Sequence, residues 1–265
     1  MIVITGYRGY IGSALYACLR REGYDVQGFD IQDGPKGDIT REEVRIKISG
    51  LRPTVIFNLA GVSGEAACKA DLLYAFRVNA NMPWQLANLC PDSVFIQASS
   101  ASVVGKLDQK RTPYAFEKAL AEQDLLPLSM TQPIFVLRFG TVLGYNRDGL
   151  TRWETPANKM AYDSVHSHKI VVCGPKLMRP WISLDALVHH LTTYAANPPR
   201  KGWDGPIPVA QINMSLEAMA KFIAERGRDV VTEINPPGED ARDYKIPALF
   251  GGDISWATKD LIQNA

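Results

Sequence analysis

The opening of the chain most constrains its fold, because a short apolar run leads directly into a glycine-rich turn. Residues 2–4 predict a buried strand, and residues 10–22 carry apolar side chains at helical spacing. Gly6, Gly9 and Gly12 lie at the junction. Glycines at this spacing let the backbone turn tightly, approach a pyrophosphate and pack the helix against the strand. The free N–H groups at the helix start favour the same anion, so this segment predicts a dinucleotide-binding unit.

Short apolar runs alternate with amphipathic segments over the rest of the first half. Further strands are expected at 26–29, 55–57, 94–96 and 134–137, and helices at 40–49, 65–90 and 113–130. Strands as apolar as these are buried on both faces, as parallel strands covered by helices are. The alternation therefore predicts an α/β fold with a doubly wound parallel sheet, whose ligands bind at the carboxyl ends of the strands.

The pattern changes after about residue 145. Residues 146–168 are polar and mixed, and later elements are expected at 170–172 (strand), 184–196 (helix), 209–212 (strand), 215–225 (helix) and in a final helix of the tail. We expect a dinucleotide-binding domain over 1–148, to which 183–213 returns. The segments 149–182 and 214–265 should form a small substrate-binding lobe over the carboxyl edge of the sheet.

Charge and cysteine usage narrow the classes of partner. The 265 residues carry 29 Lys and Arg against 28 Asp and Glu, so no strongly basic face for nucleic acid is expected. No apolar run approaches the roughly 20 residues that span a bilayer, and the opening residues lack the pattern of a signal peptide. The four cysteines lie too far apart for a CxxC metal site. These features predict a cytoplasmic globular protein with free thiols and without nucleic-acid or membrane partners.

Asp30 ends the second expected strand, 18 residues beyond Gly12. A carboxylate there can accept hydrogen bonds from the adenosine ribose and repel a 2′-phosphate, which favours NAD over NADP. Arg8 is the counterargument, because a guanidinium near that ribose could bind a 2′-phosphate. In the alternative interpretation, Asp30 caps a turn and Arg8 is a solvated loop charge.

Tyr114 and Lys118 lie one helical turn apart on the same face of an expected helix. A tyrosine ordinarily ionises near ~10, and an ammonium group together with the positive nicotinamide ring would lower that pKa. The serines of 99–102 end the preceding strand, where a hydroxyl can hold a substrate oxygen while Tyr114 moves its proton. A Tyr/Lys pair alone is usually a surface pair, and its place after a serine-rich strand end makes it informative.

Together these motifs resemble the extended short-chain dehydrogenases/reductases of the NAD-dependent epimerase/dehydratase type, which includes nucleotide-sugar epimerases. The matching segments are TGYRGYIG at 5–12, NLAG at 58–61, RVN at 77–79, SSASVVG at 99–105, PYAFEK at 113–118, LRFGTVLG at 137–144, RPWISLD at 179–185 and DARDY at 240–244. The resemblance runs over nearly the whole chain, and its most specific motifs precede residue 120.

The resemblance implies a Rossmann-like fold, NAD as the cofactor and a set of site residues. Catalysis would rest on Ser100, Tyr114, Lys118 and Asn79. The cofactor would contact Gly6, Tyr7, Arg8, Gly9, Tyr10, Ile11, Gly12, Asp30, Ile31, Asp38, Ile39, Leu59, Ala60, Gly61, Ala98, Ser99, Tyr114, Lys118, Phe139 and Thr141. The substrate would contact Ser100, Tyr114, Thr141, Asn158, Arg179 and Arg242.

Departures from the family pattern leave the substrate open. Thr141 stands where the family often has an asparagine, and Val104 replaces a usual tyrosine. Residues 101–102 are Ala-Ser, not the Asp-Glu pair of the 4,6-dehydratases, which disfavours dehydration. Arg179 suits a substrate diphosphate because a guanidinium is planar and bidentate, although it could be a structural ion-pair partner.

We therefore expect NAD-dependent hydride transfer at a secondary alcohol or ketone, with a nucleotide sugar as the favoured substrate and epimerisation as the favoured outcome. A net reductase or dehydrogenase of a small non-nucleotide carbonyl or alcohol is the alternative. A catalytically silent dinucleotide sensor is a second alternative. The helices expected at 65–90 and 113–130 often pair across a homodimer in this family. No metal site is expected, because the histidines offer no convergent set of three or four ligands.

Overall fold

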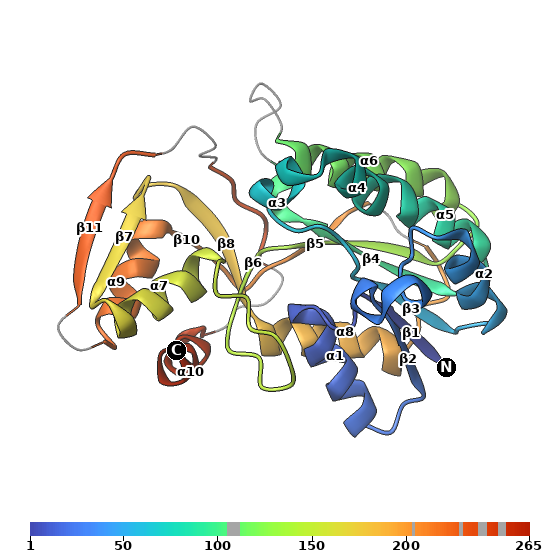
Figure 1. Cartoon of the computed structure of the whole chain (residues 1–265), viewed down its shortest axis with the longest axis horizontal. Helices are drawn as coiled ribbons and strands as arrows, with labels where there is room; N and C mark the ends of the chain where they lie inside the picture. The colour runs from blue at the N-terminus through green and yellow to red at the C-terminus, as the bar shows by residue number, and fades with distance from the viewer. Residues whose placement is uncertain (105–111, 203–204, 228–229, 238–242, 249–252) are drawn as a thin grey trace.

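The computed structural model describes residues 1–104, 112–202, 205–227, 230–237, 243–248 and 253–265. Figure 1 shows a larger part built around one twisted sheet and a smaller part that contains β7, β11, α7 and α9. These four elements span Lys169–Cys173, Val231–Asn235, Pro156–His166 and Leu216–Ala224.

The large sheet has six parallel strands in the order β2-β1-β3-β4-β5-β9. They are β1 (Ile2–Thr5), β2 (Val26–Phe29), β3 (Val55–Asn58), β4 (Val94–Ser100), β5 (Ile134–Phe139) and β9 (Ile207–Val209). The predicted α/β fold with a doubly wound, Rossmann-like parallel sheet is confirmed. The chain reverses its direction of travel across the sheet between β1 and β3, and such a switch point is where ligands of this fold bind.

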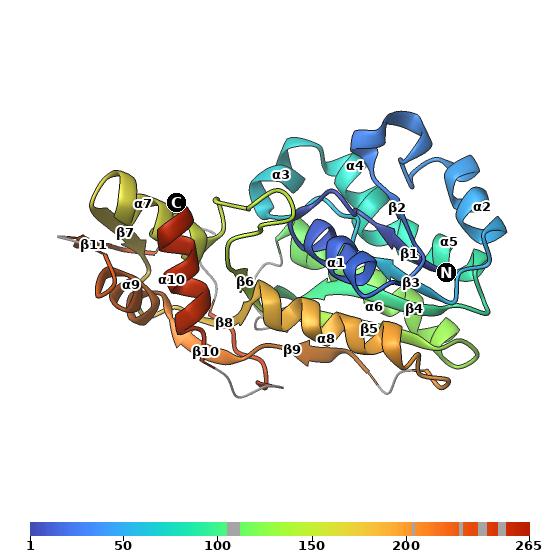
Figure 2. The same cartoon turned by 90° about the horizontal axis from the view of Figure 1, so that it is seen from below.

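Helices cover both faces of the large sheet (Figure 2). On one face lie α1 (Tyr10–Arg21) and α8 (Leu184–Ala196), and on the other lie α2 (Glu42–Gly50), α5 (Met82–Leu89) and α6 (Pro113–Ser129). Alternate residues of β1 serve the two layers, because successive strand side chains point to opposite faces. Ile4 packs with the first layer and Val3 with the second, and neither is exposed to solvent.

The smaller part has its own core and two short sheets. Its three-stranded sheet has the order β10-β8-β6, formed by Ile212–Ser215, Met178–Ser183 and Thr141–Leu143. The strands β11 and β7 form the second, parallel pair. Trp181 is fully buried among side chains of α7, α9 and α10 (Ser255–Asn264), and its indole N–H donates to the Met214 carbonyl at 3.0 Å. The boundaries of a separate substrate domain stay a prediction.

Two expected elements differ from the observed ones, and one unassigned segment contains a helix. The helix expected over 65–90 is divided into α3 (Glu65–Ala70), α4 (Leu72–Phe76), a π-helical turn (Arg77–Asn81) and α5. The break arises at Asp71, where the backbone leaves the helical conformation and the carboxylate caps α4 by accepting from the Tyr74 N–H at 3.0 Å. The strand expected at 209–212 is instead the end of β9 and the start of β10, which belong to different sheets. The segment 146–168, left unassigned, contains α7.

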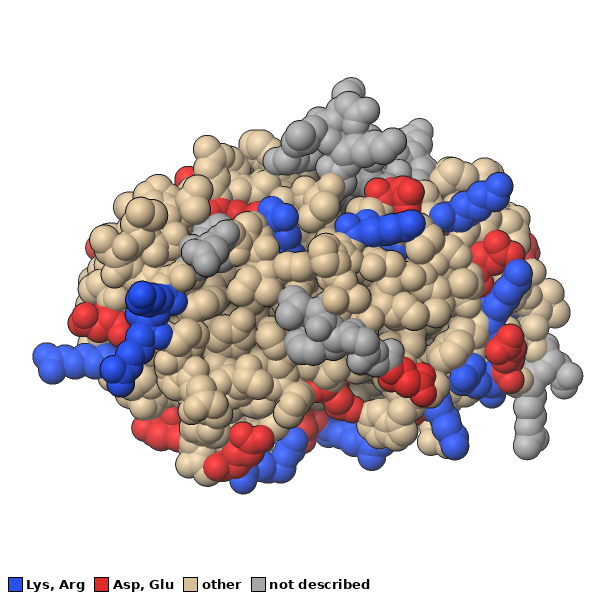
Figure 3. Space-filling model, turned by 180° about the vertical axis from the view of Figure 1, so that it is seen from behind, with Lys and Arg blue, Asp and Glu red and all other residues tan. Residues whose placement is uncertain are grey.

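Surface charge and cysteine chemistry follow the composition. Basic and acidic side chains are interspersed over the face seen in Figure 3. The four cysteines are free, and two of them, Cys68 and Cys90, are buried. Within the described ranges, every helix is too short or too polar to cross a bilayer. The cytoplasmic location stays a prediction.

Candidate active site

A groove crosses the carboxyl ends of β1, β3 and β4 at the switch point. Three neighbouring cavities form it, with volumes of about 250, 330 and 190 Å³. The first and second cavities share Gly6 and Gly61, and the second and third share Tyr114 and Arg152, so the three are continuous. The linings of the three cavities run from the glycine turn to Tyr114 at the start of α6.

The glycine turn is packed so tightly that side chains are excluded at two positions. Gly6 has a φ of +71°, and a Cβ atom there would lie 2.7 Å from the Ala60 backbone nitrogen. At Gly12 a Cβ atom would lie 2.1 Å from the Gly6 carbonyl oxygen. The turn after β1 is therefore held against both α1 and the loop after β3, as the spacing of the glycines predicts.

Most of the predicted cofactor residues line this groove. They are Gly6, Gly9, Tyr10, Ile11, Gly12, Asp30, Ile31, Asp38, Ile39, Leu59, Ala60, Gly61, Ala98, Ser99, Tyr114, Lys118, Phe139 and Thr141. Tyr7 and Arg8 lie outside the linings of these three cavities, and both make contacts with Asp33. Their cofactor contacts stay predictions.

The first cavity ends at Asp30, whose carboxylate is already engaged. The Asp30 carboxylate accepts hydrogen bonds from the backbone N–H groups of Arg8 at 3.1 Å and Gln32 at 2.9 Å. The residue is 7% exposed. Asp30 therefore caps a turn and lines the cavity at once. The Arg8 guanidinium pairs with Asp33 at 2.6 Å. This ion pair neutralises the cation that would favour a 2′-phosphate and adds a second carboxylate near Asp30.

The start of α6, the helix that carries Tyr114 and Lys118, is capped by a residue of another helix. The Glu65 carboxylate of α3 accepts from the Thr112 hydroxyl and from the Tyr114 N–H at 3.4 Å. An acidic group at this position suits the positive dipole end of α6. Glu65 thereby orients the first turn of α6, and nothing in the local sequence signals this long-range contact.

Tyr114, Ser100 and Lys118 meet where the second and third cavities join. Tyr114 lines the second and third cavities together with Ser63 of the loop after β3, and it lines the third cavity together with Ser100. The Ser100 hydroxyl also bonds to Ser102 at 2.9 Å. The ammonium group of Lys118 donates to the Ala98 carbonyl at 3.1 Å and lies 5.9 Å from the centre of the Tyr114 ring. The structure thus brings three of the four predicted catalytic groups into direct proximity.

Burial sets the ionisation of this pair. In the protein alone, burial raises the pKa of Tyr114, and this is opposite to the direction expected from Lys118. The nearby hydroxyls of Ser63 and Ser100 and the positive charge of Arg152 oppose that rise in pKa. Burial lowers the pKa of Lys118 to about 8, while the carboxylates of Glu117 and Glu122 act the other way.

Asn79 lies in the π-helical turn and is fully buried beside Lys118. Its amide nitrogen donates to the Val62 carbonyl at 2.8 Å and to the Glu117 carboxylate at 2.7 Å, which fixes the direction of its oxygen. That Oδ1 atom has no hydrogen-bond partner. A Cβ atom at Gly61 would lie 2.8 Å from this oxygen and 3.3 Å from the Lys118 nitrogen. Both polar groups therefore face the same small space above Gly61, which fits a hydroxyl-bearing ligand.

The predicted substrate-binding residues do not all lie together in the groove. Asn158 is completely buried, with its oxygen accepting from the Gly144 N–H at 3.2 Å and its nitrogen donating to the Arg152 carbonyl at 3.0 Å. The amide of Asn158 thus holds the loop before α7, and its contact with substrate stays a prediction. The Arg179 guanidinium stacks on Tyr244, 4.6 Å from the ring centre, and Tyr244 lines the third cavity.

The remaining substrate predictions concern Ser100, Thr141 and Arg242. Ser100 and Thr141 line the third cavity. Arg242 lies outside the described residues. Among the described residues, no three or more His, Cys, Asp or Glu side chains are grouped so that they could hold a metal ion.

Sequence reasoning missed Arg152, which lines both the second and the third cavity. Its guanidinium contacts Ser63, which is 89 residues earlier in the chain. Arg152 belongs to the polar segment before α7, where no motif marks one arginine above another. Only the folded chain shows that it lines the same cavities as Tyr114.

The comparisons with known proteins agree with this geometry. A protein-family model described as the NAD-dependent epimerase/dehydratase family matches residues 2–204. A search of curated proteins gives no significant match.

Solved structures share the fold at low sequence identity. The UDP-glucose 4-epimerase of Thermotoga maritima, solved with UDP-glucose, has a TM-score of 0.80 and 18% identity, covering 99% of this chain and 97% of that chain. The UDP-glucose 4-epimerase of Thermus thermophilus, in complex with NAD, has a TM-score of 0.80 and 17% identity over 99% and 97% of the two chains. TunA, an NAD-dependent NDP-hexosamine 5,6-dehydratase of tunicamycin biosynthesis, has a TM-score of 0.79 and 17% identity over 99% and 96%.

The burial of Lys118 predicts a gain in stability when its charge is removed. Because its pKa in the folded protein, about 8, lies below the ordinary 10.5, folding disfavours the ammonium form. Lys118→Met should raise the free energy of unfolding at pH 7 by about 1–3 kcal/mol. The gain should shrink as pH rises from 8 towards 10.5, where the unfolded lysine also loses its proton.

Urea unfolding at pH 7 and pH 10 measures this difference. Lys221→Met is the matched control, since the Lys221 side chain is 65% exposed on α9 and should change stability little. Equal destabilisation by Lys118→Met at both pH values would contradict a buried, disfavoured charge.

Proposed function

The chain belongs to the NAD-dependent epimerase/dehydratase family, and we propose that it transfers hydride at a secondary alcohol or ketone of a nucleotide sugar. One observation carries the proposal. A single groove joins the glycine turn and Asp30 at one end to Tyr114, Ser100 and Lys118 at the other. The first set suits a dinucleotide, and the second suits proton transfer at an adjacent hydroxyl or carbonyl.

The residues present fit NAD as the cofactor. The turn at Gly6 and Gly9 offers close approach to a pyrophosphate, and Asp30 offers a carboxylate to a ribose. The unpaired oxygen of Asn79 and the ammonium of Lys118 face one space beside Gly61, where ribose hydroxyls are suitable partners. The Arg8–Asp33 ion pair favours NAD over NADP. When bound, NAD supplies the group that accepts or returns the hydride.

The chain's own residues would manage the proton and the substrate oxygen. Tyr114 takes the proton from the substrate hydroxyl and gives one back in the reverse step. Ser100, which lines the third cavity together with Tyr114, orients the same oxygen. Lys118 stays charged below pH 8 and holds the ligand beside Asn79.

Epimerisation is the favoured outcome within this proposal. The third cavity is small, and hydroxyl-bearing side chains line much of it: Ser63, Ser99, Ser100, Tyr114, Thr141 and Thr155. Such a lining suits a sugar that is oxidised, turned over and reduced on its other face, which leaves the cofactor unchanged.

Removing the Tyr114 hydroxyl tests the catalytic assignment. Tyr114→Phe should lower kcat by about 10²–10⁴-fold on UDP-, dTDP-, GDP- or CDP-glucose, because it removes the group that moves the proton. NAD binding, measured by calorimetry, should stay within about twofold of that of the unmodified protein. Tyr162→Phe, at a partly exposed ring on α7, is the control. If the Tyr114→Phe variant keeps most of its turnover, Tyr114 is not the acid and base. A net change in NADH absorbance with the unmodified enzyme identifies a reductase instead of an epimerase.

Nucleotide recognition can be tested without turnover. In the NAD-saturated protein, UDP, dTDP, GDP or CDP at ~100 times its dissociation constant should add about 2.7 kcal/mol and raise the melting midpoint by several degrees. Arg179→Ala should reduce that shift if Arg179 holds the diphosphate, whereas Arg20→Ala on α1 should not. If no nucleotide shifts the midpoint, the nucleotide-sugar assignment is wrong and a small-molecule dehydrogenase is the better proposal.

We further propose that α4 and α6 pair across a homodimer. Leu72, Leu73, Phe76 and Phe116 are 54%, 79%, 38% and 47% exposed and line one shallow hollow between these helices. An apolar patch of this kind indicates an interface, and a twofold pair would bury the same patch on both copies. Leu73→Glu should convert a dimer to a monomer in analytical ultracentrifugation. Trp256→Glu, at an exposed apolar residue of α10, should not, and a monomeric unmodified protein would contradict the proposal.

A further inference from the structure

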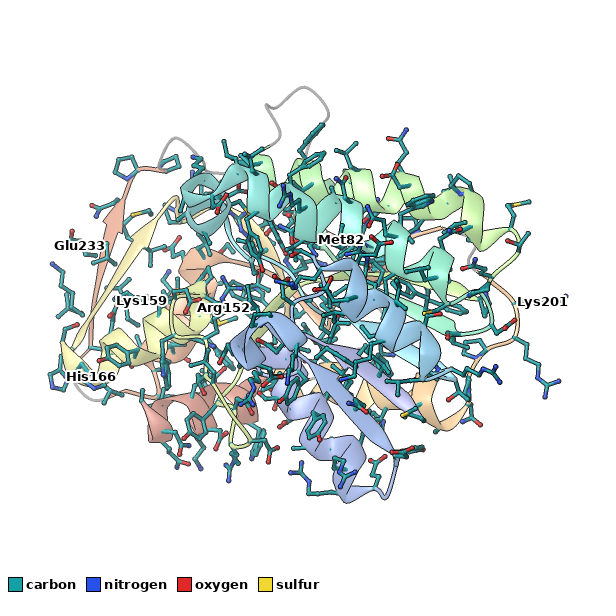
Figure 4. The ribbon with its side chains drawn as sticks, turned by 45° about the vertical axis from the view of Figure 1, so that its right-hand side comes forward. Met82, Arg152, Lys159, His166, Lys201 and Glu233 are labelled. Atoms are coloured by element: carbon teal, nitrogen blue, oxygen red, sulfur yellow. The ribbon has the colours of Figure 1, made fainter. Side chains whose placement is uncertain are left out.

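The third cavity of the groove carries a positive charge and no carboxylate among the described residues of its lining. Arg152 is the only charged side chain there, and the other described residues are apolar residues, hydroxyl-bearing residues and glycines. In Figure 4 the labelled Arg152 lies at the junction between the smaller part and the large sheet. A neutral sugar offers only hydroxyl groups, which the hydroxyl-bearing side chains can already satisfy. The cation therefore indicates a ligand with a negative charge.

The start of α7 holds the backbone of Arg152 in place. The Arg152 carbonyl oxygen accepts from the side-chain nitrogen of Asn158 at 3.0 Å and from the Thr155 hydroxyl at 3.1 Å. Asn158 is completely buried, so this anchor does not depend on a mobile surface side chain. The point from which the Arg152 side chain enters the groove is thus set before a ligand binds, and this lowers the entropy cost of binding.

The guanidinium itself is oriented and still has donors to offer. Its two terminal nitrogens donate to Ser63, one to the hydroxyl and the other to the carbonyl at 2.9 Å. Its Nε atom donates to the Glu154 carboxylate at 2.6 Å. A guanidinium has five N–H donors, so these contacts with described residues leave one donor on each terminal nitrogen. Two donors of this kind suit the two oxygens of a carboxylate.

Glu154 does not cancel the charge of Arg152 in the third cavity. The Glu154 side chain is 68% exposed, whereas the Arg152 side chain is 25% exposed. Water therefore screens the carboxylate more than the guanidinium. Glu154 also lines the second cavity and not the third. The wall of the third cavity accordingly keeps a positive charge at Arg152.

The size of the third cavity limits where the negative charge of the ligand can be. The cavity has a volume of only about 190 Å³, and Arg152 and Tyr114 both line it. An anion held by Arg152 and an oxygen held by Tyr114 are therefore parts of one small group, such as a single sugar ring. A carboxylate on that ring satisfies both conditions, and the Ser100 and Thr141 hydroxyls of the same lining can donate to it as well.

We propose that Arg152 binds a carboxylate on the sugar ring on which Tyr114 acts, so that the sugar is a sugar acid of the uronate class. This inference rests on the proposed function, in which Tyr114 moves the proton of a sugar hydroxyl. It adds no further chemical step. Arg152 selects the acidic sugar over its neutral counterpart, and the hydride and proton transfers stay as proposed above.

Binding to the NAD-saturated protein tests the selection. UDP-glucuronate is compared with UDP-glucose by calorimetry, and free glucuronate is compared with free glucose by the shift in melting midpoint. UDP-glucuronate should bind about 10–100-fold more tightly than UDP-glucose, because hydrogen bonds between charged groups add to the contacts that both sugars share. Free glucuronate should likewise give the larger shift. Equal binding of the acidic and neutral forms, or binding of neither acid, overturns the inference.

Variants at Arg152 show whether this residue makes the selection. Arg152→Gln should remove the preference for the acid and leave the affinity for UDP-glucose nearly unchanged, and Arg152→Lys should restore part of the preference. Arg147→Gln is the matched control and should keep the full preference, since Arg147 precedes α7 in the same segment, is 65% exposed and pairs with Asp260 of α10.

The pattern across ligands separates this role from others. If Arg152→Gln weakens binding of UDP, UDP-glucose and UDP-glucuronate equally, Arg152 holds the diphosphate and the inference is overturned. If the variant weakens NAD binding and keeps the preference for the acid, Arg152 belongs to the cofactor site and the inference is again overturned. If free glucuronate binds in an Arg152-dependent way and no nucleotide adds affinity, the inference stands and the nucleotide-sugar proposal fails separately.

Discussion

The site depends on a chain of buried hydrogen bonds that joins the ends of the three central strands. The Thr5 hydroxyl donates to the Asn58 side chain at 2.6 Å, and Asn58 donates to Gln97 at 2.7 Å. All three residues are at most 1% exposed, and buried polar groups are costly unless they are paired. These hydrogen bonds fix the positions of the ends of β1, β3 and β4 relative to one another. The glycine turn, the loop that leads to Ser63 and the serines of β4 all follow directly from these bonded residues.

The chemistry of the groove depends on charged side chains whose burial costs free energy on folding. Lys118, Glu117 and Glu122 are each at most 6% exposed, yet they lie within two turns of one helix. The carboxylate of Glu122 pairs with Arg138 of β5 at 2.6 Å and accepts from Ser99 at 2.5 Å. This arrangement keeps α6 against β4 and β5 in one register. Burial of the Lys118 ammonium group lowers the stability of the fold, as is common where a site needs a group with a shifted pKa.

The sequence predicts the large sheet well because parallel strands covered on both faces leave continuous apolar runs, and because the turn at Gly6 and Gly12 tolerates no side chain. It predicts the smaller part poorly. The strands β6, β8 and β10 are short and partly polar, so only their pairing makes them recognisable. Asn158 resembles a family substrate contact in the sequence, and only the fold shows that its amide, on α7, accepts from the Gly144 N–H. Arg152 and Glu65 act through contacts 89 and 49 residues away, which no local pattern encodes.

The contact between Arg152 and Ser63 also bears on how long a bound dinucleotide stays in place. Residues 150, 152 and 154 form one wall of the second cavity, residues 61–63 form another, and this contact ties the two walls together. We expect a ligand held between these two walls to leave more slowly than it would without the contact. A long residence time suits chemistry in which the same molecule that takes a hydride must wait to give it back.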